Sequence, residues 1–324
     1  MLRLLTFPSQ PVPMPQILAV FGATGVQGSS VIDHVLNDAD LSQQYRVRAI
    51  TRDPDSERAN QLKARGVEIM QGNVSDRESM RNALAGAHTV FLMTTPGFGP
   101  NAIDIEFNAA KNVADMSAET GVQFIIFSTL PSVAEISHGK YTKLTMFDAK
   151  AKAESYIRKL PINSAFYSPG SFMENWITFA APKRESEGSS TFIMAQHTSP
   201  NTTIPLIDAA EDTGKFIVSI LSNPEKYRGK TLSGAERLYS LDDIAGAIGK
   251  ASNKDVIYKQ ISVDEFLQSG QFGAETIVEL LSYFEEFGYY GDDTQGLVAS
   301  AADNTRGKLT TLDEFLEKRS PRLR

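Results

Sequence analysis

A short run near the start of the chain has the glycine spacing that lets a protein backbone hold a phosphate group. The apolar run 17–21 is followed by three glycines in seven residues, and a helical pattern begins at Ser29. The first glycine permits a tight turn, the second lets backbone amides approach a pyrophosphate, and the third lets helix and sheet pack closely. The anion then sits at the helix N-terminus, where unpaired N–H groups favour negative charge. The spacing predicts a dinucleotide-binding turn made of Gly22, Ala23, Thr24, Gly25, Val26, Gln27 and Gly28.

The end of the second predicted strand indicates which dinucleotide binds. An acidic side chain there would accept hydrogen bonds from the adenosine ribose hydroxyls, as in NAD-binding proteins. This chain has Thr51 and Arg52 instead. A guanidinium presents a planar set of donors that can pair with the 2′-phosphate of NADP, so we expect NADP(H) as the cofactor. In the alternative interpretation, Arg52 is a solvated surface charge and Asp53 contacts the ribose.

The turns after the third and fourth predicted strands supply further candidate residues. Open α/β sheets bind ligands at the carboxyl ends of their strands. Asn73 and Val74 follow the third strand, where the adenine pocket of such folds lies. The fourth strand is followed by residues that would line the central crevice, Thr94, Thr95 and Pro96. Turn residues without a ligand would look much the same.

Composition excludes several classes of function. The 324 residues contain 39 acidic and 32 basic side chains, a net charge of -7, which is the wrong sign for direct nucleic acid binding. The absence of cysteine excludes disulfides, thiolate metal sites and a cysteine nucleophile. The four histidines stand far apart, so we expect no metal site. No apolar run approaches membrane-spanning length, and we expect a cytoplasmic protein, or a nuclear one if it is a regulator.

The elements that must position these residues follow from the pattern of apolar residues. Short apolar runs alternate with longer amphipathic segments, which is typical of strands and crossover helices in a doubly wound parallel sheet. The predicted strands are 17–21, 46–51, 67–71, 89–93, 123–128 and 163–167. The predicted helices between them are 29–36, 55–65, 77–84, 103–120 and 147–159.

Several helices carry recognisable end signals. The run Ser75–Glu78 has the pattern of a capping box with the serine as N-cap, and Ser240–Asp243 repeats it with aspartate in place of glutamate. Three helices are followed by glycines, for which a positive φ costs little: Gly66, Gly86 and Gly121.

The chain divides into three predicted parts. Residues 1–15 hold four prolines and no acid, and we interpret them as a flexible leader. A dinucleotide-binding domain spans 16–168. The rhythm becomes irregular after Pro169, with a predicted hairpin near 191–203, so 169–324 forms a C-terminal substrate or partner region.

Read together with the glycine turn and Arg52, two further motifs make the chain resemble the NmrA-like family of atypical short-chain dehydrogenase/reductases. These are Phe147-Asp148-Ala149-Lys150 and the run 169–175, Pro-Gly-Ser-Phe-Met-Glu-Asn. The resemblance extends from about residue 16 to about residue 266. It implies a Rossmann-type α/β fold with a smaller, partly interleaved α+β C-terminal region, and NADP lying across the sheet edge between them.

The resemblance also implies roles for the candidate residues. The glycine turn would hold the pyrophosphate, Arg52 the 2′-phosphate, Asn73 and Val74 the adenine side, and 94–96 the central crevice. Lys150 would reach the nicotinamide ribose. Four residues would flank the nicotinamide: Phe172, Met173, Glu174 and Asn175.

The general acid of the wider superfamily is missing from its usual place. Catalysis there uses a tyrosine four positions before the lysine, and this chain has Met146 at that position. A thioether has no transferable proton. Lys150 could act by lowering a neighbour's pKa, by donating a proton itself or merely by binding ribose. Other candidate donors are Tyr141, if its loop folds back over the cofactor, and Tyr167 and Ser128 at strand ends; ordinary packing is the alternative for the last two.

Two functions remain open from the sequence. The first is an NADPH-dependent reductase of a small, apolar or aromatic organic molecule, such as a secondary metabolite, with Lys150 catalytic and an apolar cavity lined by Phe172, Met173 and Trp176. The second is a non-catalytic sensor of the NADP redox state that acts through a regulatory protein partner. Aromatic residues at 283–290 would then form a partner surface, unless they are ordinary core.

Overall fold

The computed structural model describes residues 14–271, 273–319, 321 and 323, so most of the predicted leader lies outside the described residues. Its largest sheet has seven parallel strands in the order β11-β6-β5-β4-β1-β2-β3. The six predicted strands are all present: β1 (Gln16–Phe21), β2 (Tyr45–Thr51), β3 (Glu68–Gln71), β4 (Ala87–Leu92), β5 (Phe124–Ser128) and β6 (Asn163–Pro169).

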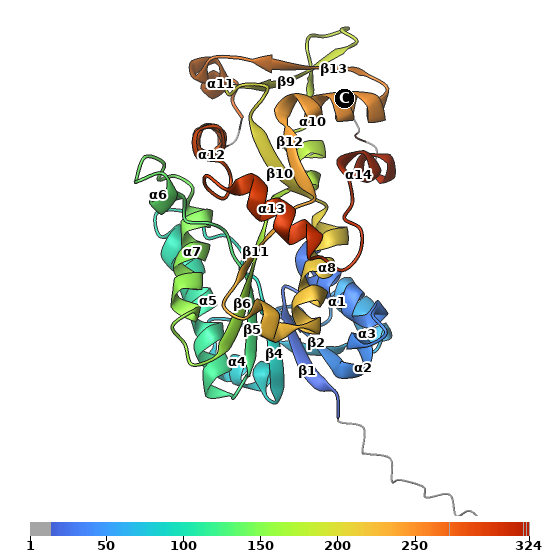
Figure 1. Ribbon diagram of the computed structural model, residues 1–324, viewed down its shortest axis with the longest axis vertical. Coiled ribbons are helices and arrows are strands. Elements are labelled where there is room, and N and C mark those ends of the chain that lie inside the picture. The colour runs from blue at the N-terminus through green and yellow to red at the C-terminus, as the bar shows by residue number, and fades with distance from the viewer. Residues whose placement is uncertain (1–13, 272, 320, 322, 324) are drawn as a thin grey trace, which may run out of the picture.

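Helices cover both faces of this sheet, which confirms the doubly wound architecture (Figure 1). One face carries α1 (Val26–Asn37), α2 (Leu41–Gln44) and α3 (Glu57–Ala64), and the other α4 (Arg77–Leu84), α5 (Ala102–Glu119) and α7 (Thr145–Ile157). The capping box at Ser75 is wrong: α4 is capped by Asp76, whose carboxylate accepts the amides of Glu78 and Ser79. Asp76 lies one residue nearer the helix than Ser75, and its carboxylate oxygen reaches those amides directly.

The C-terminal half of the chain returns to complete this layer structure. It supplies the edge strand β11 (Thr231–Gly234), which pairs with β6, and helix α8 (Ala209–Ser222), which packs against α1. The contact is close at Gly214, whose amide donates to Ser30 Oγ at 2.9 Å. A Cβ on Gly214 would lie 2.3 Å from the Ser30 carbonyl oxygen and from His34 Nδ1. The predicted interleaving is therefore confirmed, while the division at 168 and 169 stays a prediction.

Two three-stranded sheets form the other end of the molecule (Figure 1). One is ordered β12 (Arg237–Ser240), β10 (Thr203–Ile207), β7 (Ser171–Phe172), and the other β13 (Asp255–Gln260), β9 (Thr191–Gln196), β8 (Lys183–Arg184). The predicted hairpin at 191–203 is wrong, because β9 and β10 belong to different sheets. Residue alternation indicates strands but does not say which strands pair.

Further helices complete the described part of the chain. They are α6 (Val133–Ile136), the 3-10 helix η1 (Met173–Ile177), α9 (Pro224–Tyr227), α10 (Leu241–Ser252), α11 (Val263–Gln268), α12 (Ala274–Phe287), α13 (Thr294–Asp303) and α14 (Leu312–Lys318). The capping box at Ser240, which opens α10, is confirmed. Across the part of the chain that the structure describes, no helix combines the length and the apolar character that crossing a bilayer requires.

The aromatic run at 283–290 is mostly core. Tyr283, Phe284 and Tyr289 are almost fully buried and pack on one another. The hydroxyls of Tyr289 and Tyr290 donate to the carbonyl oxygens of Pro169 and Ser168, at 3.1 and 2.7 Å. These side chains therefore hold the end of β6, and the hypothesis of an exposed partner surface does not apply to them.

Candidate cofactor site and active site

The glycine turn joins β1 to α1 in a conformation that only small residues permit. Gly22 has a φ of 65°, and the Gly25 amide donates to the Gly22 carbonyl at 2.8 Å. A Cβ at Gly28 would lie 2.2 Å from the Gly22 carbonyl oxygen. Gly25 caps α1 without any side-chain hydrogen bond, and the first turn carries no acidic residue. The amides at the head of α1 thus remain available to an anion.

A groove of about 370 Å³ opens beside this turn, between α1 and α3. Its lining includes Ala23, Thr24, Gly25, Val26 and Ser29 together with Arg58, Gln61 and Arg65. Arg58 lies at the start of α3, and its Nη1 donates to the Thr24 carbonyl at 2.7 Å. Arg52 is exposed and does not belong to the lining.

The sequence pattern predicts Arg52 at the phosphate, whereas the arginine beside the glycine turn in the structure is Arg58. The only available signal was that Arg58 falls in the first turn of a predicted helix that follows the second strand. Which way that turn faces depends on how α3 packs, and the packing is not visible in the local pattern.

Two residues proposed as crevice donors have other partners. Ser128 is 3% exposed, and its hydroxyl donates to Oε1 of the buried Gln27 at 3.1 Å, which joins β5 to α1. Tyr167 is fully buried, where it packs against Phe216 and its hydroxyl donates to Thr213 Oγ1 at 3.4 Å. Burial raises the pKa of Tyr167 well above its ordinary value. Both side chains belong to the core, which agrees with the alternative of ordinary packing and not with a role as proton donors.

Lys150 lies on α7 with its ammonium at the carboxyl end of β4. Its Nζ donates to Thr94 Oγ1 at 2.8 Å and to the Thr94 carbonyl at 3.1 Å, and it forms an ion pair with Glu106 on α5. Thr94 Oγ1 in turn donates to Glu106 at 2.7 Å. Burial lowers the pKa of Lys150, and the charge of Glu106 opposes that shift. The sequence pattern predicts Thr94 and Lys150 as site residues, whereas Glu106 has the pattern of an ordinary helical residue.

The other turn residues lie at the same edge of the sheet. Asn73 is exposed, and its Oδ1 accepts the Ser75 amide at 3.0 Å, an ordinary turn contact. The Val74 carbonyl accepts Asn112 Nδ2 at 3.0 Å. Thr95 is exposed and Pro96 half-buried. These positions agree with the expected crevice edge, and their roles stay predictions.

Two of the three residues predicted to line an apolar cavity, Met173 and Trp176, lie in the hydrophobic core instead. Met173 is fully buried and Trp176 is 5% exposed, both within the hydrophobic cluster of the C-terminal region. Phe172 and Asn175 are half-buried. The Glu174 carboxylate pairs with Arg319 at 3.1 Å and accepts the Ala209 amide at 3.4 Å. The same cluster contains apolar side chains of α10 and α12.

The position of the missing tyrosine is not filled by Tyr141. The Tyr141 hydroxyl donates to the Glu286 carboxylate on α12 at 2.9 Å, and its ring packs edge-on against Tyr283 and Phe287. Met146, one turn before Lys150, is 37% exposed. Among the described residues, no group of three or more histidine, aspartate or glutamate side chains is arranged to hold a metal ion.

The chain matches the model of the NmrA-like family over residues 14–316. It belongs to the NmrA-like family. An NmrA-like family domain-containing protein of Dictyostelium discoideum is 29% identical over 311 residues, which cover 94% of this chain and 98% of that protein. The NmrA-like oxidoreductase FrzB of a Cladobotryum species is 31% identical over 273 residues, covering 76% and 77%.

Solved structures of the NmrA-like family show the same fold. NmrA, a negative transcriptional regulator crystallised in complex with NADP, superimposes with a TM-score of 0.73 at 23% identity, over 94% of this chain and 95% of that one. The family relationship thus confirms the resemblance seen in the motifs. Its named members include both oxidoreductases and a regulator.

Proposed function

We propose that this NmrA-like protein binds NADP(H) and reduces a small organic substrate. The observation that carries the proposal is the glycine turn, whose uncapped helix head opens on a groove lined by Arg58. Uncapped amides suit a pyrophosphate, and a guanidinium beside them suits the additional phosphate of NADP. The complex of NmrA with NADP and the naming of FrzB as an oxidoreductase support both parts.

We assign a role to each site residue from its position in the fold. Residues 22–28 hold the pyrophosphate, and Arg52 and Arg58 approach the 2′-phosphate from the end of β2 and the start of α3. Asn73 and Val74 border the adenine, and 94–96 border the crevice. Glu174 and Asn175 stand beside the nicotinamide, with Phe172 and Met173 as packed supports. When bound, NADPH supplies the hydride, and we assign the accompanying proton to Lys150, because Met146 has none to give.

Calorimetric titration with NADP, NADPH, NAD and NADH tests the cofactor. We expect preference for the phosphorylated forms, reduced by about tenfold or more in Arg58→Ala and to a lesser degree in Arg52→Ala, since a charged hydrogen bond contributes about 1.5–3 kcal/mol. Arg81→Ala, an exposed arginine on α4, is the control. Absence of binding to any dinucleotide would overturn the proposal.

A redox sensor that acts through a regulatory protein is the second candidate. The observation that favours it is the burial of Met173 and Trp176, since Met173 has no solvent-accessible surface. A regulator also occurs among the structural relatives. A large difference between the affinities for NADP and NADPH, with no NADPH oxidation in substrate screens, would support sensing. A protein partner that binds equally well with and without the cofactor would argue against it.

A further inference from the structure

The ammonium group of Lys150 has its hydrogen bonds fully used inside the protein. A lysine ammonium has three N–H bonds. In this structure they go to the Thr94 carbonyl, to Thr94 Oγ1 and to the Glu106 carboxylate. The side chains of Lys150 and Glu106 are 12% and 1% exposed, so solvent does little to stabilise either charge. Each charge therefore depends on the other.

The ionised state of Glu106 depends most strongly on this ion pair. Its Oε1 accepts from both Lys150 and Thr94, whereas its buried Oε2 has no hydrogen-bond partner among the described residues. A buried carboxylate with so few donors is costly to keep ionised unless a cation stands against it.

The other charged groups near Lys150 are turned elsewhere. On α7, the Asp148 carboxylate accepts from the Ser132 hydroxyl and the Ala134 amide, while Lys152 pairs with Asp104 of α5 at the surface. After the end of β4, the residue that contacts the Lys150 ammonium is Thr94, which is uncharged. Glu106 is thus the charge that opposes the loss of the Lys150 proton caused by burial.

We propose that Glu106 is a positioning residue, which keeps Lys150 protonated and, together with Thr94, aims its ammonium at the carboxyl end of β4. The use of that proton rests on the proposed reductase function. In a reduction, one substrate atom takes a hydride from NADPH and its neighbour takes a proton from Nζ. The N–H bond breaks, Lys150 is left as a neutral amine, and solvent returns the proton.

The geometry also indicates where a ligand enters this network. The hydrogen bond from Lys150 to the Thr94 carbonyl is longer than the one to Thr94 Oγ1. Unlike the bond to Glu106, it is made to an uncharged acceptor. A ribose or substrate oxygen can replace that carbonyl as acceptor while the ion pair with Glu106 stays intact. Lys150 then meets its ligand with a fixed direction and a full charge.

A pH titration of the free protein with ¹³C-labelled lysine side chains tests the proposal by NMR. The Lys150 signal is identified by its loss in Lys150→Arg. We expect the pKa of Lys150 to fall in Glu106→Gln, because the opposing negative charge is gone. Asp104→Asn removes a carboxylate from an exposed ion pair between the same two helices and should leave that pKa close to its original value. An unchanged Lys150 pKa in folded Glu106→Gln would overturn the proposal.

A second variant covers the case in which Glu106→Gln fails to fold. Thr94→Val keeps the side-chain shape but removes Oγ1 from the network, so it should lower the pKa of Lys150 by a smaller amount. No change in this variant would also count against the proposal. Because both titrations use the protein without cofactor, they stand apart from the NADPH calorimetry, and only the latter decides the proposed function.

Discussion

Gly28 stands at a point where the backbone of the glycine turn leaves no room for a side chain. Since a Cβ there would lie 2.2 Å from the Gly22 carbonyl oxygen, we expect Gly28→Ala to shift the turn and to cost about 1–3 kcal/mol in the free energy of unfolding. Binding of NADP should weaken as well. Urea unfolding and calorimetry measure the two effects.

Gly246 provides the matched control for this substitution. It lies in the exposed interior of α10, and a Cβ there would meet nothing within 4 Å. Gly246→Ala should raise stability by up to about 1 kcal/mol, because alanine is the better helix former. Equal changes in the free energy of unfolding for the two substitutions would mean that the close approach at Gly28 does not determine the conformation of the turn.

Lys150 forms a buried ion pair with Glu106, so substitution of Lys150 also affects stability. Lys150→Met leaves Glu106 buried without its cation, so we expect a loss of about 3–5 kcal/mol in the free energy of unfolding. The double variant Lys150→Met with Glu106→Leu removes both charges and should recover most of that loss. Urea denaturation of the single and double variants measures the difference. If the single variant is as stable as the unmodified protein, the ion pair does not contribute the expected amount to the free energy of unfolding.

At the scale of elements, a histidine joins strand β9 to two C-terminal helices. His197 Nε2 lies 2.9 Å from Ser282 Oγ of α12, and the ring packs against Phe266 of α11. Burial lowers the pKa of His197 below its ordinary value of 6.5. The folded protein thus binds this proton less readily than the unfolded chain, so the contribution of His197 to stability is complete above about pH 6.5 and is lost as the pH falls from there toward the lowered pKa.

Unfolding by urea at a series of pH values between about 5 and 7 tests this expectation. His197→Gln should reduce the slope of stability against pH. His88, whose pKa burial also lowers, would account for part of the slope that remains. The exposed His138→Asn serves as the control. A slope in His197→Gln equal to that of the unmodified protein would show that His197 does not titrate across the unfolding transition.

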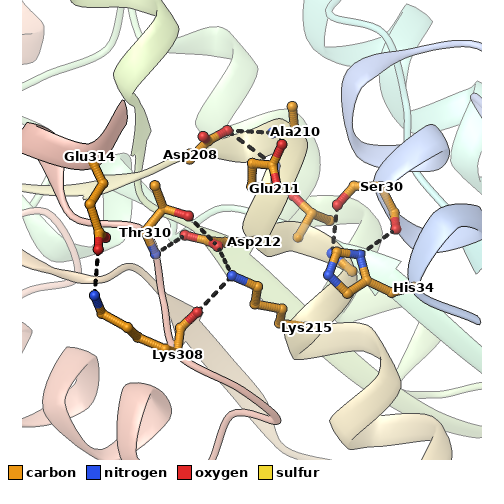
Figure 2. Close-up of polar contacts among 12 residues, drawn as sticks. Ser30, His34, Asp208, Ala210, Glu211, Asp212, Lys215, Lys308, Thr310 and Glu314 are labelled. Atoms are coloured by element: carbon orange, nitrogen blue, oxygen red, sulfur yellow. Dashed lines mark hydrogen bonds and ion pairs between the residues drawn. The ribbon is translucent and has the colours of Figure 1, made fainter. Parts of the chain in front are cut away.

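At the scale of the whole molecule, Asp212 ties the last segment of the chain to the helix that packs on α1. Asp212 is fully buried on α8 and accepts the Thr310 amide at 2.9 Å, the Thr310 hydroxyl at 3.0 Å and Lys215 Nζ at 2.7 Å (Figure 2). Lys215 also donates to the Lys308 carbonyl at 2.6 Å. The contact therefore connects the segment before α14 to the larger sheet through α8 and α1.

Asp212→Ala would leave these donors without their acceptor, and we expect it to cost about 3 kcal/mol in the free energy of unfolding. Hydrogen exchange at the Thr310 amide should accelerate beyond the global loss, because the segment opens first. The exposed pair of Asp313 with Lys250 gives the control: Asp313→Asn should cost less than about 1 kcal/mol. Uniform loss of protection across the chain in Asp212→Ala would rule out a local opening of this segment.

Features that depend on near neighbours in the chain could be predicted from the sequence. Alternating apolar runs predicted the six strands and the helices between them, since burial patterns repeat within each element. The glycine spacing predicted the turn at 22–28, because the conformation and the missing side chains are local properties. The motifs around Lys150 and Pro169 predicted the family. The cap of α4 was misplaced by one residue, an error within the usual uncertainty of helix ends.

Contacts between distant parts of the chain could not be predicted in this way, because they depend on how the elements pack in three dimensions. Glu106 meets Lys150 across 44 positions, and Thr310 meets Asp212 across 98. The partners of β9 and β10, the approach of Arg58 to the turn and the burial of Tyr167, Ser128 and Met173 likewise follow from packing. The physical reason is that one-dimensional patterns indicate which residues are buried, whereas direction, pairing and residual space depend on how whole elements pack together.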